Sequence, residues 1–107
     1  MTDKMVVFVS CDGKGQAEKI AAAVVEERLA ACVNVMPSMW SCYVWEKKLT
    51  WAEEVLLVIK TSSEMFAALE TRVRELHSYD VPEIVGVPVE AGSAPYLKWV
   101  GESVGGS

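Results

Sequence analysis

The hydrophobic positions of this chain form short apolar runs and amphipathic stripes. The run from Met5 to Ser10 is almost entirely apolar and precedes the turn signal CDGKG, a pattern typical of a buried strand. After the turn, apolar residues between Ala17 and Leu29 recur every three or four positions, with charged residues mostly between them. This spacing predicts an amphipathic helix.

The segment from Cys32 to Thr61 predicts two long strands joined by a turn around residues 46–48. Pro37 and the Ser-Met-Trp-Ser sequence after it indicate a bulge or bend in the first of these strands. Three of the four tryptophans lie in this hairpin.

The remainder of the chain predicts a helix, a strand and a short final helix. Residues 61–78 open with candidate helix caps and then carry one apolar face. Residues 83–89 predict a fourth strand, in which Pro88 favours an edge position. Ser93 is a candidate N-cap for a helix over residues 94–100.

The element order is therefore β-α-β-β-α-β followed by a helix. This order predicts an α+β fold of the ferredoxin-like, split βαβ type, with an antiparallel sheet in the order 4-1-3-2 and both main helices on one face. With 107 residues and no internal repeat or linker, the chain is expected to form one domain, residues 1–107.

The hairpin is too long for this sheet. The first and fourth strands have about seven residues each, near the mean for strands, whereas each hairpin strand is roughly twice as long. The surplus, about Met39 to Trp51, has no partner within the chain, and an exposed aromatic ribbon favours pairing with another copy. The predicted interface residues are Trp40, Tyr43, Trp45 and Trp51. The alternative is that these aromatic side chains fold back onto their own domain.

Charge and cysteine content exclude several classes of protein. The formal net charge is −5 and the sequence pI is about 4.8, with scattered basic residues, which argues against a nucleic-acid partner. No apolar run is long enough for a membrane span or a secretory signal. Three cysteines without a CxxC pair predict neither a disulfide framework nor a structural zinc site. Cytoplasmic location is therefore expected.

Four separated stretches resemble the CutA family of divalent-cation tolerance proteins, over about Val6 to Trp99. They are LAACVNVMPSMWSCYVWEKKL, EEVLLVIKT, HSYDVPEIVGVPV and YLKW. The resemblance implies a ferredoxin-like fold, a cytoplasmic homotrimer related in architecture to PII signalling proteins, and an association with copper and other divalent cations, but no known reaction. Unlike most of the family, this chain has no glycine in the hairpin turn, and it has Ser78 where many members have proline.

The predicted topology brings the end of the first strand, the end of the second helix and the start of the fourth strand to one sheet edge. Cys11, Asp12, His77, Tyr79, Asp80 and Glu83 can therefore converge. Of these, Cys11, His77 and Glu83 offer a thiolate, an imidazole and a carboxylate, which suit copper or zinc. The alternatives are a capping histidine, a turn cysteine and a glutamate that accepts backbone N–H groups. Cys32 and Cys42 are predicted to be small buried residues.

Catalytic motifs are missing from the sequence. It has one histidine, no GxSxG motif, and a CDGKGQ loop that lacks P-loop spacing. We therefore expect a non-enzymatic homotrimer without an organic cofactor, which binds or responds to divalent metal ions. The alternative is a PII-like small-molecule sensor or enzyme with an inter-subunit cleft, and a third is a scaffold that recruits another protein. The predicted cleft residues are Tyr43, Trp45, His77, Tyr79, Glu83 and Trp99.

Overall fold

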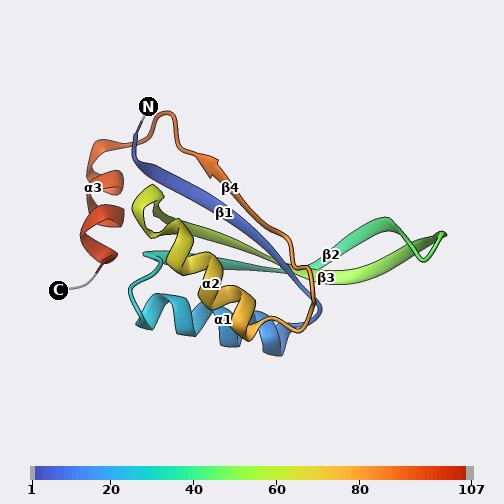
Figure 1. Cartoon of the computed structure of the whole chain (residues 1–107). Helices are drawn as coiled ribbons and strands as arrows, with labels where there is room; N and C mark the ends of the chain where they lie inside the picture. Colours follow the sequence, from blue (N-terminus) through green and yellow to red (C-terminus); the bar gives the residue numbers. More distant parts are fainter. Residues whose placement is uncertain (1, 106–107) are drawn as a thin grey trace.

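The computed structural model describes residues 2–105, and its four strands form one antiparallel sheet in the order β2-β3-β1-β4. Helices α1 and α2 lie along one face of the sheet, and α3 lies at the end opposite the projecting hairpin (Figure 1). This is the predicted split βαβ topology. The elements are β1 (Lys4–Cys11), α1 (Lys14–Glu26), β2 (Cys32–Trp45), β3 (Lys48–Ser62), a 3-10 turn (Ser63–Met65), α2 (Phe66–Leu76), β4 (Ile84–Pro88) and α3 (Ala94–Ser103).

The hydrophobic core lies between the sheet and the two main helices. Alternate residues of β1 and β3 point into it, and the apolar stripes of α1 and α2 close it from the other side. Burial of each large apolar side chain contributes about 1.5 to 3 kcal/mol. The fully buried residues include Val7, Val9, Cys11, Ile20, Val24, Leu57, Ile59, Leu69 and Val73.

The opposite face of the sheet is also apolar, although α1 and α2 do not cover it. Phe8 and Leu56 are next to buried strand residues and therefore point to this second face, where they are half-buried. Val85 and Val87 of β4 are 49% and 45% exposed. We call this surface the open face. A sheet with two apolar faces normally packs a layer on each of them.

The hairpin projects far beyond the sheet. β1 pairs with β3 only from Val55 to Ser62, so residues 39–54 have no strand partner outside the hairpin itself. We call residues 39–54 the arm. It extends the molecule to 45 Å along its longest axis (Figure 1). The predicted surplus is confirmed, and it continues three residues beyond Trp51.

A β-bulge marks the base of the arm, as predicted. Met36 pairs with Leu56 and Met39 pairs with Glu54, so two residues of β2 lie opposite one residue of β3. The second of the two, Ser38, has a φ of 62°. Bulges bend and twist a strand, which re-aims the arm relative to the sheet.

Glu46 and Lys47 form a two-residue turn at the tip of the arm, with φ values of 50° and 67°. Positive φ at both central residues is the mark of a type I′ turn, which matches the twist of the flanking strands. Glycine and asparagine adopt this conformation at low cost, whereas other residues lose roughly 1 to 2 kcal/mol. The turn therefore adopts positive φ at both central residues without a glycine, at a cost in stability.

We expect Glu46→Asn combined with Lys47→Gly to stabilise the protein by about 1 kcal/mol, because both residues then favour the positive φ. Urea unfolding should show a higher midpoint with an unchanged slope. As a control, Lys48→Gly places glycine in the extended first position of β3 and should not stabilise. An unchanged midpoint in the double variant would show that the turn is unstrained.

Two helix boundaries differ from the prediction. α1 ends at Glu26, and Leu29 lies beyond it, because Arg28 turns the chain with a φ of 60°. The Arg28 guanidinium donates to the carbonyl groups of Glu102 and Gly105. Thr61 was expected to cap the second helix, but it lies within β3, which ends at Ser62, and its hydroxyl donates to the Leu29 carbonyl. Tertiary hydrogen bonds override both local signals.

The prediction that Cys42 is a small buried residue is wrong. It lies on the arm and is exposed, because no other part of its own chain covers that surface. Cys32 is only partly buried, because its strand position directs it toward the face opposite Val33.

Candidate functional site

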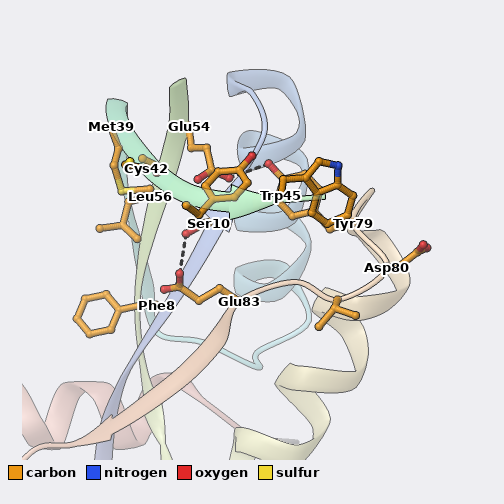
Figure 2. Close-up of a pocket in the computed structure, with 13 residues that line it drawn as sticks. Phe8, Ser10, Met39, Cys42, Trp45, Glu54, Leu56, Tyr79, Asp80 and Glu83 are labelled. Carbon is orange, nitrogen blue, oxygen red and sulfur yellow. Dashed lines mark hydrogen bonds between the residues drawn. The ribbon is translucent and has the colours of Figure 1, made fainter. Parts of the chain in front are cut away.

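A cavity of about 920 Å³ lies at the base of the arm. Its lining combines residues of the open face, of one side of the arm and of the segment that connects α2 to β4 (Figure 2). Phe8 and Leu56 come from the sheet, and Met39, Tyr43 and Trp45 come from the arm. The bulge between Met36 and Met39 lies at the base of this cavity, and bulges bend and twist a strand. We call this cavity the arm pocket.

Two hydrogen bonds hold carboxylates in the arm pocket (Figure 2). The Tyr79 hydroxyl donates to Oε2 of Glu54 over 2.7 Å, and the Ser10 hydroxyl donates to Oε1 of Glu83 over 3.0 Å. Each bond joins residues that are far apart in the sequence, so the contacts also fix the connecting segment against the sheet. Burial, followed by the hydrogen bond to Glu54, raises the pKa of Tyr79 above its ordinary value.

His77 connects the same segment to β1. Its Nε2 lies 2.7 Å from the carbonyl oxygen of Ser10, and the backbone N–H of Tyr79 donates to its Nδ1 over 3.1 Å. Because Nδ1 accepts, Nε2 must carry the proton and donate to Ser10. His77 is the C-cap residue of α2, but its ring bonds a carbonyl of β1 and not the helix carbonyls that the alternative interpretation proposed. Both ring nitrogens are occupied.

Cys11 is fully buried at the end of β1, where it packs in the core. Burial, with the nearby charges of Asp12 and Glu54, raises the pKa of its thiol to about 11. A protonated thiol is a poor metal ligand. Among residues 2–105, no group of three or more His, Cys, Asp or Glu side chains could hold a metal ion. A single chain therefore does not assemble Cys11, His77 and Glu83 into a ligand set.

The arm aromatics do not fold back onto their own domain. Trp40, Trp45 and Trp51 are 66%, 64% and 54% exposed. Strand register divides them between two faces: Trp45 and Tyr43 line the arm pocket, whereas Trp40 and Trp51 lie on the other side and stack with ring centroids 5.8 Å apart. Val44 and Leu49 extend this second apolar face toward the tip.

Four of the six residues predicted to form a cleft lie together in the structure. Tyr43, Trp45, Tyr79 and Glu83 all line the arm pocket. Trp99 does not, since it lies on α3 with Tyr96 at the opposite end of the sheet (Figure 1).

Sequence reasoning missed two polar residues of this site, Glu54 and Ser10. Both follow the alternation of their strands to the open face, next to the buried Val55 and Val9. That alternation was the available signal, but it does not reveal that the segment after α2 supplies their partners.

Comparison with known proteins identifies the family. A family model described as CutA1 divalent ion tolerance protein matches residues 5–103. The chain belongs to the CutA1 family. Protein CutA from Homo sapiens is similar, with 50% identity over 93 residues that cover 87% of this chain and 52% of that protein. This CutA1-family chain thus spans about half the length of the human relative.

Relatives of similar size also align with the CutA1-family chain. The divalent-cation tolerance protein CutA of Thermus thermophilus is 44% identical over 100 residues, covering 94% of this chain and 97% of that protein. The crystal structure of CutA from Xylella fastidiosa has a TM-score of 0.95 at 36% identity, covering 97% of this chain and 100% of that chain. The family description names tolerance of divalent ions and no reaction. Within residues 2–105, no helix is both long and apolar enough to cross a membrane.

In this CutA1-family chain we expect Tyr79→Phe to lower the free energy of unfolding by about 1 to 3 kcal/mol, because Glu54 loses its hydrogen-bond donor. The raised pKa of Tyr79 also predicts a pH effect. Its contribution to stability is fully present below the ordinary tyrosine pKa and declines as pH rises through the folded-state value. Urea unfolding at several alkaline pH values should therefore show a shallower decline in the variant.

Tyr96→Phe is the matched control, since Tyr96 is 43% exposed and lies on α3. Its expected effect is within about 0.5 kcal/mol. Equal losses in the two variants would contradict a specific role for the Tyr79 hydroxyl.

Proposed function

We propose that the protein is a homotrimer that binds or responds to divalent metal ions and thereby contributes to cation tolerance, without catalysing a reaction. One observation carries the assembly: the chain exposes apolar surface on both its open face and its arm. A two-stranded ribbon is marginally stable in water, and exposed strand edges favour association. A sister copy supplies matching apolar surfaces. The copy number of three comes from the resemblance to the CutA family.

The metal response is supported by the tolerance function named for the family. One described chain offers no group of three donors, so we propose that donors from different subunits combine at the arm pocket. Glu83 lines that pocket. The exposed Cys42 pairs with Trp51, so its thiol lies on the other face of the arm, where it can meet a sister subunit. A thiolate with a carboxylate suits zinc or copper, and the thiolate favours Cu(I). Cys11 and His77 could join only after the His77 hydrogen bonds break. The free cysteines support a reducing compartment such as the cytoplasm.

The assembly is tested by light scattering on the native protein, which should report three copies; a monomer at micromolar concentration would refute it. The metal response is tested by calorimetric titration of Cu(I), Cu(II) and Zn(II) into chelator-treated protein. Cys42→Ser and Glu83→Gln should weaken uptake at least tenfold, whereas Cys32→Ser, on β2 outside the arm, should not. Uptake that survives both changes, but is lost in Cys11→Ser or His77→Ala, would place the ligands at the originally predicted residues.

A further inference from the structure

The arm pocket has aromatic and apolar walls. Phe8 and Leu56 line it from the sheet, Trp45 from the arm, and Tyr79 from the connection to β4 (Figure 2). Tyr43 of the arm also belongs to the lining. Its volume of about 920 Å³ is within the range of small-molecule sites. The walls therefore suit the apolar body of an organic ligand, whereas divalent metal ions favour compact sets of oxygen, nitrogen or sulfur donors.

The charges in the arm pocket are all negative. Glu54 and Glu83 lie within its lining, Asp80 lies at its edge, and among residues 2–105 no Lys, Arg or His side chain lines it. Glu54 is only 8% exposed, and a carboxylate so far removed from water is costly unless it is paired.

The internal hydrogen bonds leave room for a further donor. The bond from Tyr79 engages Oε2 of Glu54, and the bond from Ser10 engages Oε1 of Glu83. Within residues 2–105, the other oxygen of each carboxylate has no side-chain donor. A ligand with a positive charge and N–H groups would complete both sets of hydrogen bonds.

We propose that the arm pocket binds a small organic cation, in which a protonated amine or related group is attached to an apolar or aromatic frame. The cationic group lies between Glu54 and Glu83, and the frame packs against Trp45 and Leu56. The faces of Trp45, Tyr43 and Tyr79 add cation–π attraction, which is strongest where water is excluded. This ligand class is distinct from the divalent metal ions that the proposed function places at the same pocket, and separate titrations of the metal ions and of the organic cation tell the two proposals apart.

Three probes of similar shape and different charge test the proposal on the native, assembled protein. They are 2-phenylethylammonium, neutral 2-phenylethanol and anionic phenylacetate. Calorimetry, with tryptophan fluorescence as a second signal, should show the cation binding at least tenfold more tightly than the alcohol, with the anion weakest. Adding n-butylammonium separates the role of the charge from that of the aromatic ring.

Substitutions of residues that line the arm pocket test whether the cation binds there. Glu83→Gln removes a charge but keeps an acceptor for Ser10, and it should weaken binding of 2-phenylethylammonium about tenfold. Trp45→Leu keeps an apolar side chain without the aromatic face, and it should weaken binding of the same cation about threefold or more. Glu90→Gln is the matched control, because it removes the same charge from an exposed residue outside the arm pocket.

Three outcomes would overturn the proposal. Equal affinity for the three charge types would show that the site does not select cations. Equal losses in Glu83→Gln and Glu90→Gln would attribute the effect to net charge alone. If neither ammonium probe binds with a Kd below about 10 mM, a sister subunit or another protein segment fills the arm pocket.

Discussion

Replacement of Trp45 and Trp51 by serine is expected to dissociate the assembly or cause it to aggregate. The two side chains lie on opposite faces of the arm, so the pair removes apolar area from both. They are 64% and 54% exposed in the single chain, and an aromatic residue buried at an interface contributes about 2 kcal/mol or more. The double substitution should therefore lower the association constant of the subunits by roughly a thousandfold for each arm. Light scattering across a dilution series measures the shift.

The control for this experiment is Val25→Ser, on the exposed side of α1. It changes an apolar residue that is 39% exposed but lies away from the arm, and it should leave the copy number unchanged. Circular dichroism should show that the folded domain survives in both variants, because neither change touches the core between the sheet and the helices. If the double tryptophan variant keeps the native size and solubility, the arm is not an interface.

The second large effect is a loss of stability, expected when a fully buried core residue is truncated. Leu57 is fully buried at the centre of β3, where it pairs with Val9 on one side and Val35 on the other. Leu57→Ala removes three carbon atoms and leaves a cavity, so we expect a loss of about 2 to 5 kcal/mol in the free energy of unfolding. Guanidinium unfolding at fixed protein concentration measures it, with the slope checked for two-state behaviour.

Val25→Ala serves as the comparison, since its partly exposed side chain leaves no closed cavity, and its expected effect is within about 0.5 kcal/mol. A loss below about 1 kcal/mol in Leu57→Ala would mean that the core collapses around the missing atoms or that association dominates stability.

The candidate site could be predicted only in part. Tyr79 and Glu83 were identified because helix and strand ends meet at a known edge of this topology. Glu54 was missed because its partner, the Tyr79 hydroxyl, comes from a segment 25 residues away along the chain. His77 was placed correctly at the end of α2, but its sequence position does not reveal that its ring N–H donates to the Ser10 carbonyl. Polar partners of this kind depend on three-dimensional proximity.

The sequence by itself determined the order of elements, the sheet topology, the bulge and the length of the arm. Each depends on local periodicity or turn chemistry, which the chain carries within a few neighbouring residues. Only the tertiary structure decided that the chain turns at Arg28 after α1, that Cys42 is exposed, and that Glu54 and Glu83 share one pocket. These features depend on which distant segments pack together, because a side chain is buried or hydrogen-bonded by its neighbours in space and not by its neighbours in sequence.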